Sequence, residues 1–222
     1  MNSNPNLTLN LTPNPTLNPT ALLSPHRIIP VVVIDDASDA VPLAHALLAG
    51  GVSVIELTLR TAAALEAASR IAREVPAICL GIGTVLDASQ VAACKAAGAQ
   101  FLVSPGWSAS VDEAVRAANL AWLPGAVTSS EVMQRRAQGF RMLKLFPAQT
   151  VGGVPLLKAY SEVFSDLKFC PTGGISAATA LEFLALPNVP CLGGSWVAPR
   201  ALVQAKRWDE ISALASQTLL IQ

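Results

Sequence analysis

Residues 28–58, IIPVVVIDDASDAVPLAHALLAGGVSVIELT, contain the unit from which the fold is built. An apolar, partly β-branched run at 28–34 is followed by an alanine-rich amphipathic segment at 39–49, the pair Gly50-Gly51 and a second apolar run at 52–58. Glycine after a helical segment is typical of a helix C-terminus. Runs that are apolar on both faces suit parallel strands covered by helices, and parallel strands need a long crossover. The stretch therefore predicts a strand, a helix and a second, parallel strand.

The same unit repeats along the rest of the chain. Further strands are expected at 78–84, 100–104, 120–124, 141–146, 168–172 and 190–195, and further helices at 62–74, 89–97, 129–138 and 177–186. Eight strands alternating with helices predict an α/β fold, a single-domain (β/α)8 TIM barrel. An open doubly wound sheet is the alternative. The barrel is favoured because glycine-rich turns at 173–174 and 193–195 follow the last two strands, where barrels frequently build a phosphate site.

The composition limits the possible partners and the domain organisation. The chain has 222 residues, of which 52% are hydrophobic and 14% charged, and its formal net charge is zero. The chain has no excess of positive charge that would attract nucleic acid or an anionic membrane. No apolar run approaches the length that crosses a bilayer. Residues 1–24 are uncharged and rich in Asn, Pro and Thr, without the pattern of a secretory signal or a transit peptide. We expect a disordered or loosely attached tail at 1–24 and the barrel at 25–222.

Cysteine and histidine usage indicates neither a metal site nor a cofactor. The four cysteines contain no C-x-x-C pair, three of them lie in apolar runs, and the chain has only two histidines. A metal-dependent enzyme needs a cluster of imidazoles and carboxylates, which this sequence does not offer. We expect reduced, buried thiols in a cytoplasmic protein.

Lys144 is the most informative residue at the carboxyl ends of the strands, where a barrel carries its reactive groups. Side chains alternate along a strand, so Met142, Lys144 and Phe146 share one face of the run 141–146. If the two intervening leucines face the helices, the lysine points into the barrel. Desolvation favours the neutral, nucleophilic form of an amine, which a Schiff base requires. The alternative is a lysine whose ammonium reaches solvent.

Glu56 and Arg60 follow from the run 52–58 and the loop after it. By the same alternation Glu56 enters the barrel beside the amine, where a buried carboxyl group can transfer protons or form an ion pair. The planar guanidinium of Arg60 suits a carboxylate, although a surface arginine is an equal alternative. The glycine turns at 173–174 and 193–195 are either bare turns or, because helices follow them, donors of backbone N–H groups to an anion.

Several short motifs occur in a specific order. They are IELTLRT at 55–61, GIGTV at 81–85, AQFLVSPG at 99–106, KLFPA at 144–148, FCPTGGI at 169–175 and GGSW at 193–196. With these motifs the sequence resembles the 2-keto-3-deoxy-6-phosphogluconate (KDPG) aldolases, which also act as 4-hydroxy-2-oxoglutarate aldolases. The resemblance extends from about residue 27 to residue 199.

The resemblance implies a class I aldolase of the Entner-Doudoroff pathway that cleaves KDPG, a phosphorylated 2-keto acid, to pyruvate and glyceraldehyde 3-phosphate without a metal. It implies that Lys144 forms the Schiff base and that Glu56 is the general acid and base. The substrate-binding residues that it implies are Arg60 and Thr84 at the pyruvyl carboxylate, Pro105, Phe146 and Thr172 along the pocket, and Arg27, Gly173, Gly174, Gly194 and Ser195 at the phosphate. It also implies a homotrimer.

Two positions depart from the family pattern, and three alternatives stay open. Gln149 stands where relatives usually have Glu, and Ala121-Trp122 replaces a usual Pro-x pair. The sister aldolase for 2-keto-3-deoxy-6-phosphogalactonate shares the lysine and the glutamate. A non-catalytic phosphate-binding barrel would have no reason to bury Lys144 with Glu56. A phosphosugar epimerase would need histidine and aspartate ligands at the strand ends, which this sequence lacks.

Overall fold

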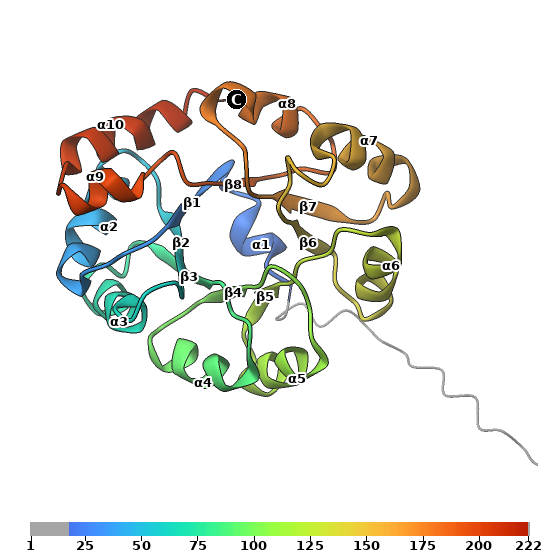
Figure 1. Cartoon of the computed structure of the whole chain (residues 1–222), viewed down its shortest axis with the longest axis horizontal. Helices are drawn as coiled ribbons and strands as arrows, with labels where there is room; N and C mark the ends of the chain where they lie inside the picture. The colour runs from blue at the N-terminus through green and yellow to red at the C-terminus, as the bar shows by residue number, and fades with distance from the viewer. Residues whose placement is uncertain (1–17, 222) are drawn as a thin grey trace, which may run out of the picture.

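The computed structural model describes residues 18–221, in which eight parallel strands form a ring surrounded by helices (Figure 1). Each expected strand run contains one observed strand. The strands are β1 (Ile28–Val32), β2 (Val54–Thr58), β3 (Cys79–Gly83), β4 (Phe101–Val103), β5 (Ala121–Leu123), β6 (Met142–Leu145), β7 (Lys168–Pro171) and β8 (Leu192–Gly194). Burial on both faces explains why these runs are continuously apolar.

The strand order closes the ring. Six strands pair in the order β5-β4-β3-β2-β1-β8, and β6 pairs with β7. Two parallel bridges join these sheets, one between Gly125 and Lys144 and one between Thr172 and Gly193. The (β/α)8 barrel is therefore confirmed, and the open sheet is excluded because β1 pairs with both β2 and β8.

The helices cover the outside of the ring and begin and end at identifiable residues. They are α2 (Ala40–Ala49), α3 (Ala64–Glu74), α4 (Ala88–Ala96), α5 (Ala109–Ala118), α6 (Ser129–Ala137), α7 (Gly153–Val163), α8 (Ala177–Leu184), α9 (Arg200–Gln204) and α10 (Trp208–Thr218), with a 3-10 turn at Ala37–Asp39. Asp87 and Thr128 start α4 and α6 with capping boxes. Gly51, Gly98 and Gly139 adopt positive φ after helices, as expected of C-terminal caps. Within the described part of the chain, every helix is too short or too polar to cross a membrane.

A short helix, α1 (Thr20–Leu23), lies within the segment that the sequence assigned to a loose tail. Leu23 is fully buried, and α1 is seen through the middle of the ring in Figure 1, just before the start of β1. The ordered structure therefore begins before residue 25. The rest of the expected tail, residues 1–17, lies outside the described residues.

Side chains fill the barrel interior, with glycine where a large neighbour needs space. Glu56, Gly81 and Phe101 are paired in register on β2, β3 and β4, so their Cβ directions point to the same side of the sheet. A Cβ on Gly81 would lie 2.1 Å from Cζ of Phe101. Because Phe101 is fully buried, its ring occupies the space that a side chain at residue 81 would need.

Candidate active site

Lys144 and Glu56 meet in the interior of the barrel. Lys144 Nζ lies 3.0 Å from Oε1 and 3.4 Å from Oε2 of Glu56. Three strands separate β2 from β6 in either direction around the ring, so the two side chains meet only through the interior. The residues are 5% and 4% exposed. The placement predicted from strand alternation is confirmed.

The space for the Glu56 carboxylate exists because the neighbouring strand has glycine. A Cβ on Gly83 would lie 2.2 Å from Glu56 Oε1, inside the contact distance of any real side chain. The hydroxyl of Thr58, on the same face of β2, donates to the carbonyl oxygen of Val32 at 2.9 Å and ties β2 to β1. Removing one partner of a buried ion pair typically costs about 3–5 kcal/mol, because the remaining charge has no compensation. The site therefore depends on both members of the pair.

The backbone of Lys144 is held on the side of β5, and its ammonium lies near an aromatic ring. Its N–H donates to Pro124 at 2.9 Å, and its carbonyl accepts from Ala126 at 3.0 Å. The ammonium is 5.5 Å from the centroid of Phe146. A Cβ on Gly173 would lie 3.2 Å from the same ring, so Phe146 also borders the turn after β7. Lys144, Phe146 and Gly173 are thus brought together as predicted.

Pro105 reaches the site through a close backbone contact. A Cβ on Gly125 would lie only 2.0 Å from the carbonyl oxygen of Pro105, and the Gly125 N–H donates to Gly106 at 3.1 Å. Gly125 is also the residue that bridges to Lys144. The loop after β4 therefore contacts the residue that pairs with Lys144.

Arg60 and Thr84 follow β2 and β3, which are neighbours in the ring. Arg60 is exposed, and none of the ion pairs in the part of the chain that the structure describes involves it. Thr84 has φ +62°, in the left-handed region that a β-branched residue rarely adopts. Such a conformation costs about 1–3 kcal/mol and persists only where the surroundings impose it. This strain marks Thr84 as a candidate functional residue. The sequence alone does not reveal the strain.

The two glycine turns lie side by side at the carboxyl ends of β7 and β8. Gly173 and Gly174 have φ +100° and +77°, and the Thr172–Gly193 bridge joins the two strands. The N–H groups of Gly173, Gly174 and Ser195 donate to no acceptor within residues 18–221. Free N–H groups in such turns attract an anion. The hydroxyl of Thr172 is also buried without a partner among the described residues.

Gln149, one of the two departures from the family pattern, braces the first glycine turn. Its N–H donates to the carbonyl oxygen of Gly173 at 3.1 Å, and a Cβ on Gly174 would lie 2.6 Å from its own Cβ. The uncharged side chain therefore packs beside the turn without adding a negative charge there.

Arg27 does not lie with these turns, which corrects its expected role at the phosphate. It precedes the first residue of β1, and its carbonyl accepts from Leu192 at the start of β8. It lines a separate cavity of about 330 Å³ with Gly51, Val52 and Thr218. In a parallel barrel the starts and the ends of the strands lie at opposite ends, so Arg27 is at the end away from Gly173 and Ser195.

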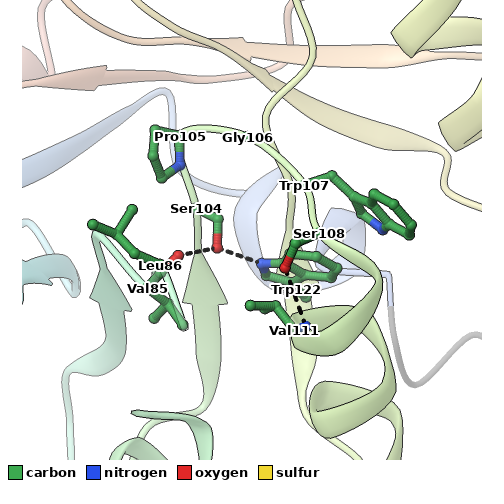
Figure 2. Close-up of a pocket in the computed structure, with 9 residues that line it drawn as sticks. All are labelled: Val85, Leu86, Ser104, Pro105, Gly106, Trp107, Ser108, Val111 and Trp122. Carbon is green, nitrogen blue, oxygen red and sulfur yellow. Dashed lines mark hydrogen bonds between the residues drawn. The ribbon is translucent and has the colours of Figure 1, made fainter. Parts of the chain in front are cut away.

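Ser104 is a buried polar residue that sequence reasoning missed. Figure 2 shows its hydroxyl between Val85 and Trp122, donating to the Val85 carbonyl at 2.7 Å and accepting from the Trp122 indole at 3.0 Å. The indole also packs edge-on against Phe140. The second departure from the family pattern, Ala121-Trp122, is therefore accommodated by a hydrogen bond and an aromatic contact. The only indication of Ser104 in the sequence is a serine at the end of an apolar run.

A lysine paired with a glutamate inside a closed (β/α)8 barrel, beside turns whose N–H groups have no acceptor within residues 18–221, is the arrangement that a Schiff-base aldolase with an anionic substrate needs. Residues 20–214 match the family model described as KDPG and KHG aldolase. The 2-dehydro-3-deoxy-phosphogluconate aldolase of Pseudoalteromonas atlantica is 48% identical over 192 residues, covering 86% of this chain and 89% of the relative. The KHG/KDPG aldolase of Escherichia coli is 43% identical over 199 residues, covering 90% and 93%.

Among solved structures, the KDPG aldolase from Legionella pneumophila, with pyruvate captured at low pH as a covalent carbinolamine intermediate, is 41% identical. It superposes with a TM-score of 0.87, covering 90% of this chain and 97% of that chain. The chain belongs to the KDPG and KHG aldolase family. The predictions of the family, of the barrel fold and of an aldolase are therefore confirmed.

The strain at Thr84 gives a test of its role. Glycine adopts φ +62° freely, so Thr84→Gly relieves about 1–3 kcal/mol of strain while adding about 0.5–1 kcal/mol of unfolded-state entropy. We expect an unchanged or raised Tm, and, if Thr84 donates a hydrogen bond to the substrate carboxylate, a KM for the keto acid that rises about tenfold. Calorimetry and steady-state kinetics measure the two effects.

Asn119→Gly is the matched control for Thr84→Gly. Asn119 has φ +53° at the end of α5, so the substitution changes the same kind of backbone position outside the site. We expect its KM to equal that of the wild type. An unchanged KM in Thr84→Gly as well would show that Thr84 does not contact the substrate.

Proposed function

We propose that this protein cleaves KDPG to pyruvate and glyceraldehyde 3-phosphate through a Schiff base on Lys144, and that it also acts on 4-hydroxy-2-oxoglutarate. The observation that carries the proposal is the 3.0 Å contact between Lys144 and Glu56 inside the barrel. Two similar proteins are named for the same substrates, which supports the gluconate-derived configuration.

The amine of Lys144 attacks the C2 carbonyl of the substrate and forms a carbinolamine. Loss of water gives a protonated imine, which accepts the electron pair of the C3–C4 bond when that bond breaks. Glyceraldehyde 3-phosphate leaves, and an enamine of pyruvate remains on the lysine. Protonation at C3 and hydrolysis of the imine release pyruvate and restore the amine.

Glu56 is the group positioned to move the protons in these steps. Its carboxylate contacts the amine that reacts, and Gly83 leaves space beside Oε1. It transfers a proton during dehydration of the carbinolamine, accepts the C4 hydroxyl proton as the C3–C4 bond breaks, and returns a proton to C3 of the enamine. One carboxyl group can serve all three steps because they occur within reach of the same nitrogen.

The two ends of the substrate bind on different parts of the barrel rim. Arg60 and Thr84 hold the pyruvyl carboxylate after β2 and β3, while Pro105, Phe146 and Thr172 line the pocket. The phosphate binds to the free N–H groups of Gly173, Gly174 and Ser195, to the hydroxyl of Ser195 and to the β8 turn at Gly194. Backbone N–H groups can therefore hold the phosphate without Arg27.

We further propose a homotrimer in the cytoplasm, without a metal or an organic cofactor. Leu86, Met133 and Val163 are 62%, 61% and 71% exposed, and burying them between subunits would remove apolar surface from water. All four cysteines are free thiols, which suits a reducing compartment. No group of three or more possible metal ligands occurs among residues 18–221.

The Schiff base is tested by trapping it. Incubation with pyruvate and borohydride should add one reduced pyruvyl group per chain, located on Lys144 by peptide mass. Lys144→Arg should abolish the adduct, because a guanidinium stays protonated and forms no imine. Lys168→Arg, on the neighbouring strand β7, is the control and should label normally. An adduct on another lysine, or activity that survives pyruvate with borohydride but is lost with a chelator, would disprove the mechanism.

The role of Glu56 is tested with Glu56→Gln. Gln is close to isosteric and still accepts a hydrogen bond from the amine, but it cannot transfer a proton. Losing one positioned acid or base typically slows a reaction roughly 100- to 10,000-fold, and three shared transfers place the expected loss of kcat in the upper part of that range. Pyruvate release measures kcat, and circular dichroism checks the fold. A kcat near that of the wild type would remove Glu56 from the mechanism.

The phosphate site is tested by comparing two substrates. Ser195→Ala should raise KM for KDPG roughly tenfold, the effect of losing one hydrogen bond to a charged group, with a smaller change for 4-hydroxy-2-oxoglutarate. Arg27→Ala, at the other end of the barrel, should leave the ratio of the two KM values unchanged. Equal changes on both substrates in Ser195→Ala would show that the hydroxyl does not contact the phosphate.

A further inference from the structure

The buried Arg135 stacks on the half-buried Trp107 on the outside of the barrel. The guanidinium carbon of Arg135, on α6, lies 3.5 Å from the ring centroid of Trp107, in the loop between β4 and α5. Arg135 is 4% exposed, and its Nε and Nη1 have no hydrogen-bond partner among the described residues. The Trp107 indole nitrogen is also buried without a partner there. The planar contact is therefore the main interaction that fixes this arginine against the loop.

The electrostatics of Arg135 agree with a deeply placed cation. Burial lowers the pKa of Arg135, and the nearby carboxylates of Asp112 and Glu131 oppose this change. Asp112 is itself paired with Arg116 at 2.9 Å, so it does not bind Arg135 directly. The cation–π attraction between a guanidinium and an indole ring is stronger when the guanidinium is desolvated than when it is exposed to solvent.

The loop that carries Trp107 is connected to the reactive lysine through two contacts. Pro105 and Gly106 lie against Gly125, which has no side chain to separate them. Gly125 in turn bridges to Lys144. A shift of Trp107 would therefore be transmitted to Pro105 and to the strand edge beside the amine.

The inner side of the same loop is packed only at its start, where the Ser104 hydroxyl is bonded to Val85 and Trp122. A cavity of about 190 Å³ lies between the loop and the barrel wall, bordered by Val85, Leu86, Val111 and Trp122 (Figure 2). In this view the Trp107 side chain points away from Val85 and Leu86. Beyond Ser104 no side chain fills the cavity, so packing on this side does not hold the rest of the loop in place. The stack on Arg135 supplies a restraint from the outer side.

We propose that the Trp107–Arg135 stack is a positioning device that holds residues 104–108 against Gly125, so that Pro105 borders the keto-acid end of the Lys144 site. Trp107 and Arg135 are positioning residues, and neither touches the reacting atoms. The inference rests on the proposed Schiff-base function. Because the loop borders the pocket and leaves the amine in place, the stack governs how tightly the keto acid binds before the imine forms.

The experiment measures the rate of borohydride-trapped adduct formation against pyruvate concentration. Trp107→Leu removes the aromatic face and Arg135→Lys removes the planar cation. We expect the half-saturating pyruvate concentration to rise roughly 10- to 100-fold in both, the range in which small misplacements of binding groups act. The trapping rate at saturating pyruvate should change less than threefold. The double variant should lose no more than the worse single one, because both remove the same contact.

Two controls separate positioning from stability. Trp107→Phe keeps a smaller aromatic face for the guanidinium and loses the pyrrole ring with an N–H that donates to no described residue, so it should restore half-saturation to near that of the wild type. Arg136→Lys changes the next residue of α6, which pairs with Asp166 on the surface, and should bind pyruvate normally.

The possible outcomes distinguish this inference from the proposed function. A lowered Tm in Trp107→Leu and Arg135→Lys with unchanged half-saturation, measured well below Tm, would show that the stack is only structural and would overturn the inference. Failure of Trp107→Phe to restore binding would overturn it as well. If the wild type itself forms no adduct on Lys144, the proposed function fails instead.

Discussion

The contact between Lys144 and Glu56 across the barrel is the interaction on which the rest of the site depends. It requires a closed ring, because β2 and β6 lie opposite each other and their side chains meet only through the interior. Burying two charges has a desolvation cost that their attraction rarely exceeds, so such a pair is weak evidence for a stabilising role. A barrel that needed only stability would place apolar side chains there. The retained amine and carboxylate therefore point to a chemical role of the pair.

Two glycines, which have no side chain, determine the shape of this site together with the reactive residues. Gly83 leaves the volume that the Glu56 carboxylate occupies, and Gly125 lets the Pro105 backbone approach the strand next to Lys144. A Cβ at either position would lie within 2.2 Å of an existing atom. Neither glycine has a positive φ, so neither is needed for backbone conformation. Their role is close approach, and it links the interior of the barrel to the loops on its rim.

The sequence predicted the features that depend on neighbouring residues, and it did not predict those that depend on residues far apart in the chain. The eight strands and the inward placement of Lys144 and Glu56 follow from local alternation along a strand, which needs no knowledge of distant residues. Arg27 was assigned to the phosphate through the family resemblance alone, whereas its place just before β1 puts it at the end of the barrel where the strands start. The positive φ of Thr84 depends on tertiary surroundings. The Trp107–Arg135 stack joins two elements 28 positions apart with no motif between them.

The position of β6 in the ring explains how one lysine can serve an extended substrate. On one side β6 bridges to the end of β5, where Gly125 carries the Pro105 loop. On the other side β6 pairs with β7, which ends in the Gly173–Gly174 turn with free N–H groups. The keto acid and the phosphate can therefore bind on opposite sides of the same strand, with the imine carbon between them. In the proposed reaction the bond that breaks lies on the phosphate side of that carbon, so the proposed phosphate site would hold the leaving aldehyde while the lysine keeps the pyruvyl group.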